Sequence, residues 1–230
     1  MAKRQKPGTE GDGTSPKSAG AKELPSLRAT IERALARDEP PDDLLPMLER
    51  LRRMAIEGSD DRRFADRRIA ELLLETEPWR AALHIRRLVR ELPDDDAHWA
   101  LMGLAQALLG NHKFAAQSYR RALALDPGNP WYAHNLGHIL DVGLDRARDG
   151  LPWLERAHKR IPDSTPVTCS VAHALFRLSR LDEARAVLAP LLRKNAHDPD
   201  VWAIARQLDR AEAATAPARR KARAKRRTPS

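Results

Sequence analysis

The stretch that decides the fold is DAHWALMGLAQALLGNHKFAAQSYRRALALDP, residues 96–127. Its large and small residues recur three, four or seven positions apart, the spacing of one helix face, in two runs: Trp99, Met102, Gly103 and Gln106, then Ala115, Tyr119 and Ala122. A turn is predicted at Gly110 and Asn111. Because such a helix pair cannot bury both of its faces alone, we expect copies of it to be stacked on either side.

Similar spacings recur before and after this stretch. The next copy contains Leu136, Gly137, Gly150, Leu154, Ala157 and Pro162, with one extra residue expected in the turn between Gly143 and Arg148. A weaker copy precedes it, with Ile69, Ala81, Ile85, Leu88 and Pro93. The last copy has Val171, Ala172, Ala184 and Leu188, and departs from the pattern at Leu191 and at the late Pro199.

These residues resemble the tetratricopeptide repeat (TPR), a helix-turn-helix unit of about 34 residues with a large aromatic, an apolar-small pair, Ala, an aromatic, Ala and a closing Pro. The resemblance implies an all-α fold, a right-handed α-solenoid of about three to four stacked helix-turn-helix units with capping helices. The expected repeats are residues 60–93, 94–127, 128–162 and 163–199.

The segments outside the repeats differ in composition. Residues 1–23 are polar and are expected to form a disordered arm. Residues 24–59 predict a helical hairpin, either a cap or a degenerate repeat, and residues 200–214 predict a capping helix with Trp202 covered. Pro217 is expected to separate this helix from a disordered basic tail, residues 215–230.

The net charge of +9 belongs to the two ends of the chain. Residues 27–214 hold 29 basic and 29 acidic residues, so the expected scaffold is neutral. The tail carries seven cations that could bind nucleic acid or another polyanion: Arg219, Arg220, Lys221, Arg223, Lys225, Arg226 and Arg227. No aromatic residue accompanies them to stack on bases, so any such contact is expected to be weak.

Several classes of protein are disfavoured by what the sequence lacks. The single cysteine, Cys169, allows no internal disulfide and suits a reducing compartment. No run approaches the roughly 18 apolar residues of a membrane span, and the N-terminal residues do not resemble a secretory signal, so a cytoplasmic location is expected. No phosphate-binding loop, nucleophile elbow or Cys-x-x-Cys pair is present, so we expect neither an enzyme nor a cofactor.

The resemblance also implies a binding surface, because related repeats bind an extended peptide or a partner helix in the concave groove lined by the first helix of each repeat. Asn135 occupies the place of an Asn that often contacts the ligand backbone in such proteins. The corresponding groove residues are Trp131, His134, Asn135, His138, Cys169, His173, Phe176 and Arg177. Family members that clamp a terminal carboxylate use Lys and Arg, whereas Ala100, Leu104, Pro166 and Ser170 stand here, so binding of chaperone C-termini is not expected.

Four of these side chains could also be metal ligands. His134 and His138, and Cys169 and His173, form two pairs spaced four residues apart at equivalent places in neighbouring repeats. Packed helices lie about 8–10 Å apart, whereas ligands must come within about 2 Å of a zinc ion. We therefore interpret the four as polar groove residues and predict no metal site.

Together these features predict a non-enzymatic scaffold or adaptor that binds a protein segment in its groove. Two alternatives stay open. One is a nucleic-acid-associated protein that acts through the basic tail, and the other is a TPR-type assembly or secretion chaperone, which would share every feature described above.

Overall fold

The computed structural model describes residues 16–194 and 198–225, with the side chains of residues 23–194 and 198–214. All regular secondary structure in these residues is helical, which confirms the predicted all-α class. No helix within the described residues is both long enough and apolar enough to cross a membrane. The chain forms two units, Met1–Leu73 and Leu74–Ser230, and each is described by itself.

The first unit contains α1 (Pro16–Ala36), α2 (Pro41–Met54) and α3 (Asp60–Leu73). The prolines at 40 and 41 separate α1 from α2, and Gly58 lies between α2 and α3 with φ 75°. Helix α2 packs against both of its neighbours and buries Leu44, Leu48 and Leu51 along one face. This hairpin and its apolar stripe agree with the spacing of the leucines in the sequence.

The beginning of α1 corrects the prediction of an arm over residues 1–23. The helix starts at Pro16, so residues 16–23 are helical rather than irregular, and residues 1–15 lie outside the described part. Proline is well suited to the first position of a helix because its missing N–H needs no partner there. The Ala, Lys and Glu residues that follow have high helix propensity, which outweighs their polarity.

Ion pairs connect the three helices of the first unit. The buried Asp66 carboxylate accepts a hydrogen bond from Arg52 at 2.7 Å, which joins α3 to α2. Arg28 on α1 reaches Asp60 and Asp61 at 2.7 and 2.8 Å and lowers the pKa of the Asp60 carboxyl from its usual value. The Arg28 guanidinium also lies 4.5 Å from the centre of the Phe64 ring.

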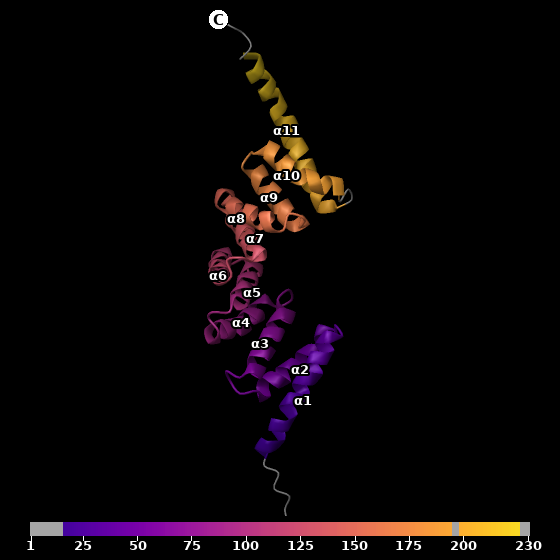
Figure 1. The fold of residues 1–230 in the computed structure, drawn as a ribbon, viewed down its shortest axis with the longest axis vertical. Coiled ribbons are helices and arrows are strands. Elements are labelled where there is room, and N and C mark those ends of the chain that lie inside the picture. The colour runs from indigo at the N-terminus through magenta and orange to yellow at the C-terminus, as the bar shows by residue number, and fades with distance from the viewer. Residues whose placement is uncertain (1–15, 195–197, 226–230) are drawn as a thin grey trace, which may run out of the picture. The chain divides into compact units, whose positions relative to one another are not determined.

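The second unit is a succession of helix pairs, visible from α4 to α11 in Figure 1. Helix α5 packs on α6, α7 on α8, and α9 on α10, and each pair also packs on the next helix along the chain. The helices are α4 (Pro78–Glu91), α5 (Asp96–Leu108), α6 (His112–Leu125), α7 (Pro130–His138), the π-helix η1 (Ile139–Gly143), α8 (Ala147–Arg160), α9 (Thr165–Arg177), α10 (Leu181–Lys194) and α11 (Pro199–Lys225).

The predicted repeats 94–127, 128–162 and 163–199 each contain one of these helix pairs. The weaker repeat, 60–93, is divided instead: α3 belongs to the first unit and α4 to the second. In its sequence, Ile69 and Leu88 stand where Gly103 and Ala122 stand in the next copy.

Glycines create the close contacts within the pairs. A Cβ atom on Gly103 would lie 2.9 Å from the ring of Tyr119, which is buried. In the next pair, a Cβ atom on Gly137 would lie 2.7 Å from Leu154, and one on Gly150 would lie 2.5 Å from the Gly137 carbonyl oxygen. The backbones of α7 and α8 therefore touch directly.

The extra residue of the third copy lies in η1 rather than in the predicted turn at 143–148. The Leu144 N–H donates to the Ile139 carbonyl at 2.9 Å, a bond that spans five residues and closes a π turn. π-helices are rare and occur mostly as single turns of this kind. This turn buries the Asp141 side chain and exposes that of Val142.

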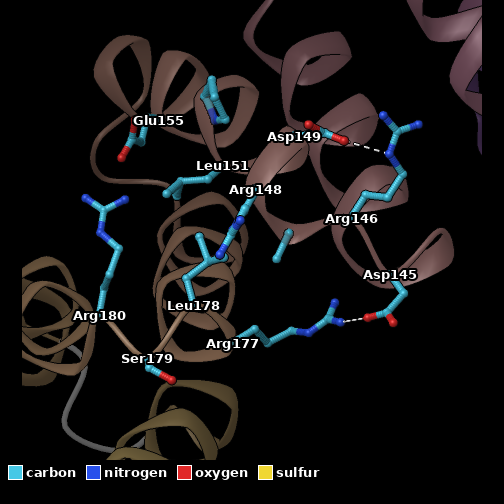
Figure 2. Close-up of a pocket in the computed structure, with 12 residues that line it drawn as sticks. Asp145, Arg146, Arg148, Asp149, Leu151, Glu155, Arg177, Leu178, Ser179 and Arg180 are labelled. Atoms are coloured by element: carbon cyan, nitrogen blue, oxygen red, sulfur yellow. Dashed lines mark hydrogen bonds and ion pairs between the residues drawn. The ribbon is translucent and has the colours of Figure 1, made fainter.

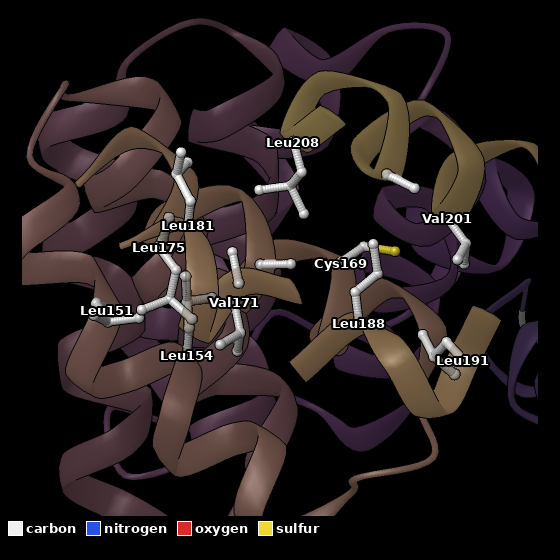
Figure 3. Close-up of a cluster of buried hydrophobic side chains, with 14 residues drawn as sticks. Leu151, Leu154, Cys169, Val171, Leu175, Leu181, Leu188, Leu191, Val201 and Leu208 are labelled. Carbon is white, nitrogen blue, oxygen red and sulfur yellow. The ribbon is translucent and has the colours of Figure 1, made fainter. Parts of the chain in front are cut away.

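The C-terminal helices differ from expectation in two respects. Helix α11 continues to Lys225 without ending at Pro217, because the Ala, Arg and Lys residues around that proline favour helix. Val201 and Leu208 are buried against α9 and α10 in the core cluster of Figure 3, but Trp202 is 45% exposed rather than covered. Helix α10 runs through Pro190 from Leu181 to Lys194.

Candidate functional site

Three ring side chains form a row along α7, which we name the ring row: Trp131, His134 and His138. Asn129 caps the start of this helix, because its side chain accepts hydrogen bonds from the backbone N–H groups of Trp131 and Tyr132. Consecutive ring centres in the row lie 6.1 Å apart, and Trp131 is 49% exposed. About half of the Trp131 surface is therefore open to a ligand.

Hydrogen bonds hold the row in place. His134 Nε2 lies 3.0 Å from the Ser170 hydroxyl and so connects α7 to α9. The neighbouring Asn135 side chain lies near enough to the buried Tyr119 hydroxyl of the preceding pair to affect its pKa. Burial lowers the pKa values of His134 and His138 from their usual value, and the proximity of the two rings lowers that of His134 further. Both rings are therefore neutral at pH 7.

Beside the ring row lies a hollow of about 350 Å³, the groove hollow, between the α7–η1 helix, α9 and the first turns of α11. Its described lining residues are His138, Val142, Pro166, Cys169, Ser170, His173, Asp200, Ala203 and Ile204. Side chains from the first helices of two repeats thus meet a third helix that follows them. The result is a largely apolar recess in the face where a groove was expected.

Cys169 lies in the wall of the groove hollow. Burial, together with the nearby carboxylates of Asp198 and Asp200, raises the pKa of its thiol to about 11. At neutral pH this side chain is a protonated thiol, a weak nucleophile and a weak metal ligand. It contributes to the apolar wall of the hollow.

The η1 turn is fastened to α9 through Asp141, which is 1% exposed. One oxygen of its carboxylate accepts from Arg177 at 2.7 Å, and the other lies 2.9 Å from His173 Nδ1. Arg177 also donates to the Asp141 backbone carbonyl and to Asp145. These contacts fix the turn that carries Val142 into the groove hollow.

A second recess, about 1,000 Å³ in volume, lies around the start of α8 and the turn between α9 and α10, and we name it the arginine hollow (Figure 2). Three of its arginines are paired with carboxylates: Arg177 with Asp145, Arg146 with Asp149 at 2.6 Å, and Arg180 with Glu183 at 2.6 Å. These pairs neutralise much of the positive charge of the arginine hollow. The hollow is therefore less suited to binding an anion than its number of arginines alone would indicate.

The eight predicted groove residues divide among four places. His138, Cys169 and His173 meet in the groove hollow, and Trp131, His134 and Asn135 lie on α7 beside it. Phe176 packs against the buried core instead. Arg177 points into the arginine hollow, where Figure 2 shows it beside Asp145.

The two other predicted sites can be placed only in part. No group of three or more His, Cys, Asp or Glu side chains suited to a metal ion occurs among the described residues. His134 and His173 are engaged with Ser170 and Asp141. The side chains of the tail cations from Arg219 to Arg227 lie outside the described part of the chain.

The sequence did not point to Val142, Asp200 or Ile204. Val142 reaches the groove hollow only because of the π turn, and the other two come from α11, which was expected to act as a cap. One signal was present: Asp198 and Pro199 mark a helix start at this place, and the Asp198 carboxylate caps α11 through the Asp200 and Val201 N–H groups.

Comparisons with known proteins agree with this architecture. Residues 143–208 match the sequence profile described as "Tetratricopeptide repeat". The structure resembles MamA (residues 41 to the end) from Desulfovibrio magneticus RS-1, with a TM-score of 0.68, 15% identity and coverage of 76% of this chain and 97% of that one. None of the curated proteins compared with this sequence matches it significantly.

Two further solved structures have the same fold. The TPR protein TTC0263 from Thermus thermophilus gives a TM-score of 0.59 at 18% identity, covering 80% of this chain and 98% of that one. YrrB, described as a TPR protein with an unusual peptide-binding site, gives a TM-score of 0.55 at 22% identity, covering 61% and 73%. At these identities the likeness concerns the fold.

The stacked helix pairs and the recess between them define an α-solenoid of the kind that mediates protein–protein interaction. Residues 143–208 match the tetratricopeptide repeat in sequence, and the chain resembles solved tetratricopeptide-repeat structures in fold.

Proposed function

We propose that this chain is a non-enzymatic adaptor that binds a segment of a partner protein along the ring row and the groove hollow. The observation that carries the proposal is the recess itself, in which His138 from α7, Val142 from η1 and Ile204 from α11 line one apolar cavity. The peptide-binding site described for YrrB, a protein of the same fold, supports the same function here. The cytoplasmic location stays a prediction from the sequence.

The test uses peptides selected from a random library displayed on phage, with the full chain as bait. Changing both Trp131 and His138 to alanine is expected to lower the affinity for the selected peptides at least about tenfold, because large exposed ring residues dominate such interfaces. Trp79→Ala is the matched control, since Trp79 is 58% exposed on α4, outside the ring row. Affinities are measured by fluorescence anisotropy.

Two results would contradict the proposal. One is the failure of any peptide to be selected, and the other is an equal loss of affinity in the Trp79 control. Removal of residues 218–230 is expected to leave peptide affinity within about twofold of that of the full chain, because the groove and not the basic tail carries the function. A large loss on removal of the tail would favour the polyanion-binding alternative instead.

A further inference from the structure

The walls of the groove hollow determine what it can hold. Val142 from η1, Pro166 from α9, and Ala203 and Ile204 from α11 give it apolar sides. Its volume of about 350 Å³ lies at the low end of the roughly 300–1,000 Å³ typical of ligand pockets. A recess of this size fits one large apolar side chain of a bound segment.

The rim of the hollow is negatively charged. Asp200 is exposed there, and within the described part of the chain its carboxylate has no hydrogen bond or ion pair. No Lys or Arg occurs among the described residues that line the hollow. The Asp198 carboxylate also lies close to Cys169, and His138 is neutral at pH 7 because burial lowers its pKa.

The cation expected in the groove does not neutralise this rim. Arg177 is held by Asp141 and Asp145 and faces the arginine hollow. The charge of Asp200 is thus left for a ligand, and a cation on the ligand would complement it.

We infer that the groove hollow takes one large apolar side chain of the partner segment, and that Asp200 selects a Lys or Arg within two residues of that side chain. This inference rests on the proposed function and names the chemistry of its partner, a segment that is both basic and apolar.

The chain's own basic tail does not fit this description. Residues 219–227 consist of Arg, Lys and Ala, so they offer cations but no large apolar side chain. Residues 219–225 form the C-terminal end of α11, and at 1.5 Å per residue position 219 lies about 28 Å along the helix from position 200. The occupant is therefore a segment of another protein.

The probe is a set of synthetic nonapeptides with a central Phe, Leu or Ala and with Lys, Ser or Glu at the two flanking positions. With the wild-type chain, affinity is expected to fall from Lys to Ser to Glu by about two- to five-fold at each step, the size of an exposed charge pair. Replacing the central Phe by Ala is expected to cost about tenfold or more. Asp200→Lys is expected to reverse the order of the charged flanks.

Ala203→Trp fills the hollow without removing a polar group, and it is expected to lower the affinity for the peptides with a central Phe at least about tenfold. Ala213→Trp, at an exposed position of the same helix, is the matched control. The inference is overturned if Ala203→Trp leaves peptide affinity unchanged. It is also overturned if the chain prefers a large apolar residue but does not distinguish Lys, Ser and Glu flanks. If either result is found but the peptides still lose affinity when Trp131 and His138 are changed to alanine, the proposed function stands. If no peptide binds, both fail.

Discussion

Replacing Gly150 by alanine is expected to lower the free energy of unfolding of the second unit by about 2 kcal/mol. The new Cβ atom would lie 2.5 Å from the Gly137 carbonyl oxygen and 3.0 Å from the Asp141 backbone nitrogen. Both are backbone atoms, so α8 must move away from α7. Alanine gains about 1 kcal/mol over glycine in a helix interior, but overpacking costs up to about 3 kcal/mol or more when backbone must shift.

The measurement is thermal unfolding followed by circular dichroism, with an expected fall in Tm of about 4–8 °C for a unit of this size. Gly128→Ala is the matched control, because its nearest obstacle is the Asp126 side chain at 3.2 Å, which can move. That variant is expected to unfold within about 2 °C of the wild type. A Gly150→Ala variant as stable as the wild type would mean that α7 and α8 do not touch as described.

Asp141→Ala is expected to have the second large effect, a loss of about 3 kcal/mol in the free energy of unfolding. The substitution removes a carboxylate that is 1% exposed and leaves both His173 and Arg177 without it. Arg177 keeps Asp145 as a partner, so the cost stays at the low end of that for a broken buried ion pair. The π turn at η1 also loses its attachment to α9.

Asp145→Ala is the control, because it removes the other partner of the same arginine. The Asp145 side chain is 86% exposed, and exposed ion pairs contribute about 0–1 kcal/mol. Chemical denaturation by urea measures both variants. Equal destabilisation by the two substitutions would contradict the description of Asp141 as the buried anchor of η1.

The helix pairs of the second unit could be predicted because local spacing determines them. Gly103, Gly137 and Gly150 stand where two helices touch, and prolines at 127 and 162 close successive copies. Such residues act within about 35 positions of sequence, so the pattern is visible without knowledge of distant contacts. The repeat at 60–93, which has Ile69 and Leu88 in place of two of the small residues, is where the prediction was weakest.

Other features depend on choices that the sequence leaves open. An interval of 35 residues between Pro127 and Pro162 shows that one residue is inserted but not where it is absorbed. A loop and a π turn both satisfy that spacing, and packing around Asp141 favours the turn. The extents of α1 and α11 were underestimated because polar composition was taken as a sign of disorder, although Ala, Lys and Arg also favour helix.

The candidate site could be predicted only in part for the same reason. His138 lies on α7, Cys169 and His173 lie on α9, and the three line one recess. The orientation of Arg177 depends on the buried Asp141, and the contribution of Ile204 depends on how α11 docks. Both are tertiary contacts that no local spacing encodes.

The most direct measurement of the central claim, that a protein segment lies in the groove hollow, is the alkylation rate of Cys169. This residue is the one cysteine of the sequence and lines the hollow, so its reaction reports on that place alone. With the thiol pKa raised to about 11, the thiolate fraction at pH 8 is on the order of 0.1%, against about a quarter for an ordinary cysteine. Slow alkylation is expected, rising about tenfold per pH unit between pH 7 and 9.

At a saturating concentration of a selected peptide, the alkylation rate is expected to fall at least about tenfold, because a side chain in the hollow covers the thiol. The same peptide with its large apolar residue changed to alanine serves as the control and should give little protection. An unchanged rate with the wild-type chain fully bound would contradict the claim, because it would place the peptide elsewhere on the molecule.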